Sequence, residues 1–221
     1  PGGGLIGMRT RSLRSLCCFL VLFSASVIAA AQTRRDALLE YRQGNYAEAV
    51  EICTAEIAET PTNMDSYAVL CWSLVALGKH DEAANFAVQA RSINRYDPRI
   101  VEVLGEARFH QGRNEEALKL FQEYVTLAPE GGRLDVAYYF MGEIYARLGR
   151  YRHADIALST AVRHAPGNAK WWTRLGYARE KANDARYAVG AYEKALGIDP
   201  QSVDAQRGLE RKQRAVLVER D

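Results

Sequence analysis

Apolar and small residues recur along most of the chain with a period of about 34 residues, and within each period their spacing is helical. The clearest mark is a glycine followed five positions later by an alanine. It occurs at Gly44/Ala49, Gly78/Ala83, Gly112/Ala117 and Gly149/Ala154, with Asn183/Ala188 as a fifth copy. The alanines are 34, 34, 37 and 34 residues apart. Each period therefore predicts two short helices joined by a tight turn, repeated five times.

Small residues mark the contact between the two helices of each period. Seven positions before each turn stand Ala37, Cys71, Gly105, Gly142 and Gly176. Seven residues are about two helical turns, so this position faces the second helix and lets the two backbones approach closely. In the second helix a small residue returns as Ala90, Ala161 and Ala195, with Glu56 and Tyr124 as exceptions, and Cys53, Ala87, Phe121, Leu158 and Tyr192 lie on the same stripe.

Helix pairs this short cannot bury an apolar face alone, so the repeats predict a solenoid in which neighbouring units stack. Prolines at positions 61, 129, 166 and 200 indicate where units end. We expect units at 33–63, 64–97, 98–131, 135–168 and 169–202, and a polar-faced capping helix with a short tail at 203–221. The one longer spacing places about three extra residues at 130–134, which favours a longer connection over a hinge.

The amino-terminal stretch has a different composition. Arg9, Arg11 and Arg14 precede an apolar run over residues 16–31 that contains no charged residue, as in a secretory signal peptide. We expect cleavage after Ala31, with an uncleaved anchor as the alternative. Cys17 and Cys18 lie at the start of the run, where lipidation is not expected, and residues 1–7 receive no role.

Charge and cysteine content narrow the function classes. The three arginines of the signal account for the positive balance, so the net charge of +2 becomes about −1 without it. No basic face is implied, and a nucleic-acid partner is not expected. The remaining Cys53 and Cys71 have no metal-ligand spacing and read as buried thiols, with a disulfide between neighbouring helices as the alternative.

No motif for catalysis or ligand chemistry accompanies the repeats. A nucleophile elbow, a phosphate-binding glycine loop and a His-Glu-x-x-His motif are all missing from the sequence. The four histidines occupy different places in their units, which argues against a shared metal site. We therefore expect no enzyme activity, no cofactor and no metal.

The repeat pattern resembles that of the tetratricopeptide repeat (TPR) family, and of exported bacterial members in particular. The resemblance is carried by Gly142, Tyr145, Gly149, Tyr151, Ala154, Ala161 and Pro166, and by Trp172, Leu175, Gly176, Ala188, Tyr192, Ala195 and Pro200. It covers about residues 33 to 202 and is weakest in the first unit, where Asp36 and Glu40 replace apolar residues. The family's fold is all-α, a right-handed superhelical solenoid of antiparallel helix pairs.

The resemblance also implies a binding surface. In the family the first helices line a concave face that touches ligand, and by position this surface comprises Tyr41, Arg42, Trp72, Glu102, Glu106, Phe109, His110, Tyr139, Glu143, Arg147, Tyr177 and Lys181. The open alternative is that Trp72, Phe109 and Tyr139 only pack between units. Some members hold a chaperone's carboxyl-terminal peptide with a basic clamp. Here only Lys170 and Arg174 fit it, and Glu102 and Glu106 would repel a carboxylate.

Together these observations predict a non-catalytic adaptor or scaffold that holds a peptide or a partner helix in its groove. We expect it in the bacterial periplasm, with the membrane contacted only through the signal or anchor segment. Two alternatives remain open: a small-molecule or lipid carrier with an aromatic cavity around Trp72, Phe109 and Tyr139, and a structural solenoid that self-associates into an oligomer.

Overall fold

A computed structural model describes residues 36–218, with side chains up to residue 211. This part of the chain is all helical, with no strand. Its helices are α2 (Ala37–Gln43), α3 (Tyr46–Glu59), α4 (Met64–Ala76), α5 (His80–Ile93), α6 (Pro98–His110), α7 (Asn114–Leu127), α8 (Leu134–Arg147), α9 (Tyr151–His164), α10 (Ala169–Lys181), α11 (Ala185–Ile198) and α12 (Val203–Val218). The expected signal segment lies outside the described residues. Among those described, none of the helices is both long and apolar enough to span a membrane.

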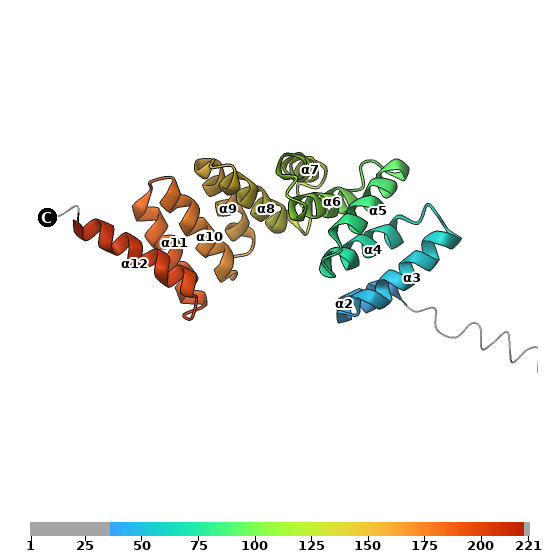
Figure 1. The fold of residues 1–221 in the computed structure, drawn as a ribbon, viewed down its shortest axis with the longest axis horizontal. Helices are drawn as coiled ribbons and strands as arrows, with labels where there is room; N and C mark the ends of the chain where they lie inside the picture. The colour runs from blue at the N-terminus through green and yellow to red at the C-terminus, as the bar shows by residue number, and fades with distance from the viewer. Residues whose placement is uncertain (1–35, 219–221) are drawn as a thin grey trace, which may run out of the picture. The chain divides into compact units, whose positions relative to one another are not determined.

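The helices stack in chain order as antiparallel pairs (Figure 1). Each helix packs against the next one along the chain, and the first helices of successive pairs also contact one another. Helix α12 packs on both α11 and α10, so it occupies the place that a sixth first helix would take. The predicted all-helical solenoid is confirmed, and α12 covers the apolar side of the last pair.

The turn within each pair closes in the same way. The turn residue has a left-handed backbone, with φ of 70° at Gly149 and 64° at Asn183. At Gly149 its N–H donates to the carbonyl of Ala146 at 3.1 Å, and the next N–H, of Arg150, donates to Tyr145 at 2.8 Å. This is the Schellman arrangement, which satisfies two carbonyls at the end of a helix. The recurring glycine is therefore required by backbone conformation.

The small residues seven positions before each turn are sites of close helix contact. A Cβ added at Gly142 would lie 2.5 Å from Cγ of Leu158, and one added at Gly176 would lie 2.6 Å from Cε1 of Tyr192. Leu158 and Tyr192 stand four positions after the repeat alanines and are fully or almost fully buried. Each missing side chain on the first helix thus leaves room for a large one on the second.

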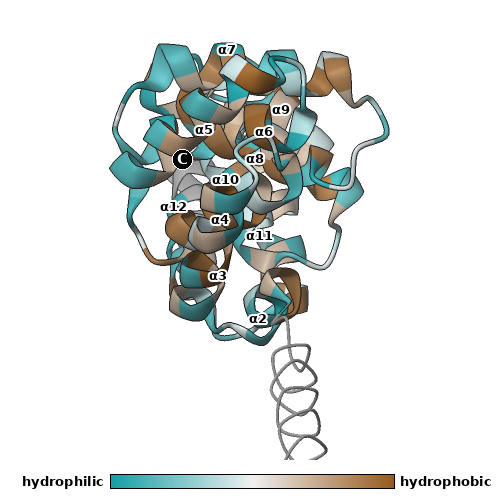
Figure 2. Cartoon of the chain, turned by 90° about the vertical axis from the view of Figure 1, so that its right-hand side faces the viewer, coloured by the Kyte–Doolittle hydropathy of each residue, from teal (hydrophilic) through white to brown (hydrophobic). Residues whose placement is uncertain are grey.

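The core follows the repeat and consists of three buried clusters that succeed one another along the stack. Figure 2 shows brown and teal segments alternating along the helices, as expected of helices that bury one side. Cys53 and Cys71 are completely buried free thiols, so no disulfide joins them in the structure. The Sγ of Cys71 lies 3.6 Å from the carbonyl oxygen of Ala83. Burial raises the pKa of each thiol to about 12.

The longer spacing appears as a longer connection. Residues 128–133 join α7 to α8, whereas four residues join each of the other pairs, at 60–63, 94–97, 165–168 and 199–202. Tyr124, an exception to the small-residue rule, packs against this loop: its hydroxyl accepts a hydrogen bond from the N–H of Arg133 at 3.2 Å. Gly131 makes room for it, because a Cβ there would lie 2.5 Å from the same hydroxyl.

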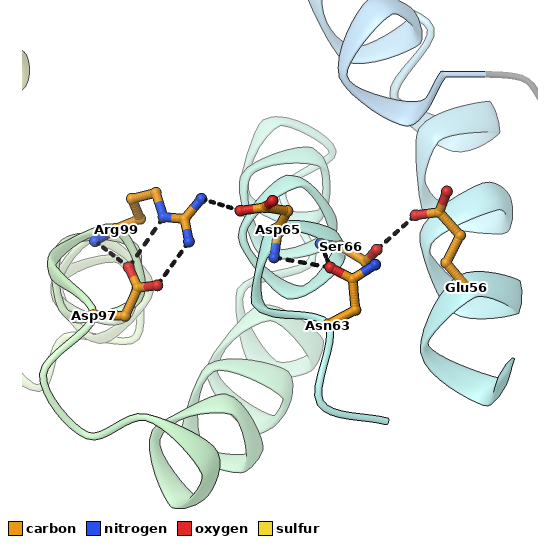
Figure 3. Close-up of polar contacts among 6 residues, drawn as sticks. All are labelled: Glu56, Asn63, Asp65, Ser66, Asp97 and Arg99. Carbon is orange, nitrogen blue, oxygen red and sulfur yellow. Dashed lines mark hydrogen bonds and ion pairs between the residues drawn. The ribbon is translucent and has the colours of Figure 1, made fainter. Parts of the chain in front are cut away.

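Polar contacts also connect α3, α4 and the start of α6, in the amino-terminal part of the described stack (Figure 3). Asn63 caps α4 by accepting from the N–H groups of Asp65 and Ser66. The Ser66 hydroxyl donates to Glu56 of α3, the other exception to the small-residue rule. Asp65 in turn pairs with Arg99 of α6 at 2.6 Å. Both exceptions therefore have a polar contact that holds the next helix.

Candidate functional site on the first helices

Arginine–glutamate ion pairs connect the first helices of the later units. Arg174 of α10 reaches back to Glu143 of α8, with Nε 2.6 Å from Oε1. Arg211 of α12 reaches back to Glu180 of α10 at 2.9 Å. In both pairs the glutamate side chain is 12% exposed, so the carboxylate is largely shielded from solvent. Ion pairs therefore connect α8 to α10 and α10 to α12 on the face formed by the first helices.

The pair nearest the amino terminus has two carboxylates. Arg133, at the end of the long loop, lies 2.8 Å from Glu102 and 2.9 Å from Glu106, both on α6. Glu102 is 1% exposed, so its ion pair with Arg133 is shielded from solvent on the acidic side. Burial raises the pKa of Glu102 to about 7, while Arg133 opposes the rise and Glu106 adds to it.

A cavity opens beside this group. Tyr41, Trp72, Val75 and Ala76 line it together with Glu106 and Arg133, and its volume is about 120 Å³. The rings of Tyr41 and Trp72 are 5.9 Å apart and tilted. The indole Nε1 of Trp72 is buried and has no hydrogen-bond partner in the described part of the chain. Three first helices and the long loop thus build one small pocket with aromatic walls and the Glu106–Arg133 ion pair on its other side.

The middle of the face is built on a buried ring. Phe109 of α6 is buried and packs on Phe140, with ring centroids 4.8 Å apart. The guanidinium of Arg147 lies over Phe109 at 3.8 Å, in the geometry of a cation–π contact. His110 is exposed at the end of the same helix and stacks on His80 at 4.2 Å. Burial, His80 and Arg147 together lower the pKa of His110.

Aromatic rings continue the face toward the carboxyl terminus. Tyr139 of α8 stacks on Trp171 of α10, with centroids 5.0 Å apart and planes 12° from parallel. On α10 the guanidinium of Arg174 lies 4.8 Å from the ring of Tyr177, and Lys181 approaches the same ring at 5.7 Å. Aromatic and basic side chains of two units thus lie side by side.

A second cavity, of about 300 Å³, lies at the carboxyl-terminal end of the face, where Arg174, Tyr177 and Arg211 line it together with Thr173, Tyr192, Asp204 and Arg207. Two of its arginines are already paired with glutamates, and the Tyr192 hydroxyl donates to Glu180 at 2.8 Å. Several of the polar side chains around this cavity are therefore already engaged in contacts within the protein, including the one that holds α12.

The structure brings most of the expected surface residues into contact along this face, but three are placed differently from a free contact residue. Glu102, Phe109 and Glu143 are buried, because the next helix or the long loop covers them. Their side chains therefore pack beneath the residues that form the surface. Arg42, in contrast, is exposed near the end of α2.

The three rings proposed for a carrier cavity have different surroundings in the described structure. Trp72 lines the small pocket, Phe109 lies under Arg147 and Tyr139 stacks on Trp171. All three are partly or fully buried between units, so the packing alternative describes part of their role. No observation on these residues favours a carrier.

Three residues that complete the site do not follow from the repeat pattern. Arg133 lies in the irregular connection at 130–134, and Trp171 and Arg211 occupy none of the positions that face ligand in the family. A signal for Arg133 existed, because it is the basic residue of the inserted segment that precedes the helix stacked next to Glu102 and Glu106. Within the described residues, no cluster of three His, Cys, Asp or Glu side chains is placed to hold a metal ion.

Comparisons with known proteins agree with this architecture. A family model described as tetratricopeptide repeat matches residues 70–131 and 139–203, more than half of the chain. The Hsp70-Hsp90 organizing protein of Triticum aestivum is 36% identical over 105 residues, covering 48% of this chain and 18% of that protein. A BBSome complex member BBS4 homolog of Drosophila melanogaster is 22% identical over 170 residues, 73% of this chain and 35% of that protein. The chain spans less than half the length of these two relatives.

Solved structures share the fold at low sequence identity. A crystal structure of MamA superposes with a TM-score of 0.64 at 19% identity, covering 76% of this chain and 97% of that one. YrrB, described as a TPR protein with an unusual peptide-binding site, superposes with a TM-score of 0.63 at 17% identity, covering 79% and 88%. At these identities the likeness shows the fold alone. With the repeat model matching both halves of the helical stack, the chain belongs to the tetratricopeptide repeat family.

Proposed function

We propose that this protein is a non-catalytic adaptor that binds an extended peptide or a partner helix along the face of its first helices. The observation that carries the proposal is the row of aromatic and basic side chains on that face. Tyr139 and Trp171 stack there, and Arg174 and Lys181 flank Tyr177. Aromatic and arginine side chains are the residues that most often anchor protein interfaces.

The arrangement of the helices supports a polypeptide ligand. First helices of neighbouring units contact one another, so equivalent positions recur at each unit along one side of the stack. A peptide or helix offers side chains at regular intervals and can engage several such positions at once. The family membership and the neighbour YrrB, described as having a peptide-binding site, point in the same direction.

Site-specific photo-cross-linking in cells tests this proposal. A photoreactive p-benzoylphenylalanine at position 177, on the proposed face, should give covalent adducts with a polypeptide. The same group at position 187 is the matched control, because Tyr187 is 61% exposed on a second helix. Adducts at 187 but not at 177, or none at either position, would contradict binding along the first helices.

We further propose that the protein is exported and works in the bacterial cell envelope as part of a larger assembly. The arginine-flanked apolar run at residues 16–31 supports export. Amino-terminal sequencing of the protein from its own cells should then begin near Gln32, or find the uncleaved chain in the membrane fraction. Recovery of an intact amino terminus in a soluble cytoplasmic fraction would refute export.

A further inference from the structure

The small cavity between α2, α4 and α6 differs chemically from the rest of the face that the first helices form. Two of its walls are rings, Tyr41 and Trp72, and its opposite side is formed by Glu106 and Arg133. We infer that this cavity is the subsite for a cationic side chain, lysine or arginine, of the bound peptide. This inference rests on the proposed peptide-binding function and specifies the ligand of one part of the same surface.

The charges around the cavity favour a cation. Glu102 and Glu106 each carry a carboxylate, and both lie within 3 Å of the single guanidinium of Arg133. When both carboxyls are ionised, one positive charge faces two negative ones, and a second cation would complete the balance and favour the ionised form of Glu102, whose pKa is raised by burial. Glu102 is almost completely buried, so the surrounding water screens this imbalance poorly.

The walls suit the form of such a side chain. A ring face attracts a cation placed within about 6 Å of its centre, and the Tyr41 and Trp72 rings border the same small space. Val75 and Ala76 add apolar surface, against which the methylene groups of a lysine or arginine stem would pack. An ion without such a stem would leave this apolar part of the cavity unused.

An unsatisfied polar atom belongs to one of the lining residues. The indole N–H of Trp72 is buried without a hydrogen-bond partner among residues 36–211. Buried polar groups in native proteins are almost always hydrogen-bonded, so this donor indicates a missing acceptor. A peptide residue with a cationic side chain supplies a backbone carbonyl as that acceptor and a side-chain donor for the carboxylate of Glu106.

An anionic ligand fits less well, although Arg133 borders the cavity. That guanidinium already has two carboxylates as partners, and an anion would lie beside both of them. The like-charge repulsion would oppose binding, whereas a cation is attracted by the same pair.

The test is a nuclear magnetic resonance titration of the unaltered protein, followed at the indole N–H signal of Trp72. The signal is assigned by Trp72→Phe, and the indole signals of Trp171 and Trp172 serve as internal references. The probe is a capped pentapeptide with lysine at its centre and glycine elsewhere, compared with versions carrying arginine, norleucine or glutamate there. Lysine or arginine should shift the Trp72 signal in a saturable way, at least tenfold more tightly than norleucine.

Variants separate the pocket from the rest of the surface. Glu106→Gln should weaken binding of the lysine peptide about tenfold or more. Glu123→Gln, which removes a carboxylate paired with Arg91 between two second helices, should leave it unchanged. Equal binding of lysine and norleucine, preference for glutamate, or no saturable shift with either cationic peptide would each overturn the inference. Because the peptide comparison uses the unaltered protein, it holds whether or not the variants are stable.

The two proposals fail in different ways. Cross-links at position 177 without any response to cationic peptides would refute the cationic subsite and leave the adaptor in place. An absence of polypeptide cross-links would refute the adaptor itself.

Discussion

The hydroxyl of Tyr124 accepts a hydrogen bond from the backbone N–H of Arg133, and this contact fixes the start of α8. Tyr124 stands where the repeat places a small residue, and Gly131 leaves the space that its hydroxyl needs. The long loop, the oversized tyrosine and the arginine that pairs with Glu102 and Glu106 therefore form one unit of structure.

Tyr124→Phe should lower the free energy of unfolding by about 0.5–1.5 kcal/mol, the usual net contribution of one hydrogen bond. It should also weaken binding of the lysine peptide, because Arg133 loses its backbone anchor. The matched control is Tyr67→Phe. The hydroxyl of Tyr67 is buried without a partner in the described residues, so its removal should be neutral or stabilising. Chemical denaturation of both variants measures the difference, and equal losses would contradict the role given to Tyr124.

Gly142→Ala should destabilise the protein by about 1–3 kcal/mol, because the added Cβ would overlap Leu158 in a packed core. Gly190→Ala is the control on a helix surface, where no atom lies within 4 Å of the added Cβ. Alanine in a helix loses less conformational entropy on folding than glycine, so this change should stabilise by about 0.5–1 kcal/mol. Thermal unfolding should thus shift in opposite directions, and a fall at both sites would argue against close packing at Gly142.

The pH dependence of stability should carry a contribution from Glu102. Its pKa is raised from 4.5 to about 7 in the folded protein, chiefly by burial, so the folded state binds a proton that the unfolded state releases. The stability that comes from this proton is complete below about pH 4.5 and is lost as pH rises toward 7 and beyond. The charged or titratable groups around Glu102 are Arg133, Glu106, Asp135, Tyr41 and Tyr124.

Glu102→Gln should therefore flatten the fall in unfolding free energy between pH 5 and pH 8. The gain over the unaltered protein should grow with pH and reach on the order of a few kcal/mol at pH 8. Glu123→Gln should keep the original slope. Urea denaturation at a series of pH values checks this, and a parallel fall in all three proteins would rule out Glu102 as the source.

Cys53 and Cys71 should resist alkylation in the native protein. Both thiols are buried and their pKa values are raised to about 12, so little reactive thiolate is present at pH 8. Iodoacetamide labelling followed by peptide mass spectrometry should find both unmodified before denaturation and both modified in urea. Rapid labelling of the native protein, or a disulfide-linked peptide containing both residues, would contradict the buried free thiols.

The backbone design could be predicted from the sequence because it repeats. Gly149 and Asn183 mark positions that need a left-handed backbone, and Gly142 and Gly176 mark positions where helices nearly touch. Each of these requirements restricts the residue type, so it leaves a visible pattern. The capping helix could be predicted on a different ground, because an amphipathic segment follows the last unit.

The site was predictable only in part, because its pairings are not periodic. Arg133 lies in the one irregular loop, and its reach to Glu102 depends on how Tyr124 and Gly131 shape that loop. Glu102 occupies a position that faces ligand in the family, and nothing in its own helix indicates that a neighbouring loop covers it. The ion-pair partner of a long charged side chain depends on three-dimensional geometry, which a linear sequence pattern does not encode.

Each of the helices between residues 37 and 218 contacts helices of its own unit and of the adjacent units only. A force applied to the two ends of the stack would act in series on the contacts between neighbouring units, because no contact between distant units of the described stack shares the load. Pulled in an optical trap, such a chain should lengthen in successive steps as pairs detach. A partner bound across several of these contacts would hold the units together and raise the force at which the first step occurs.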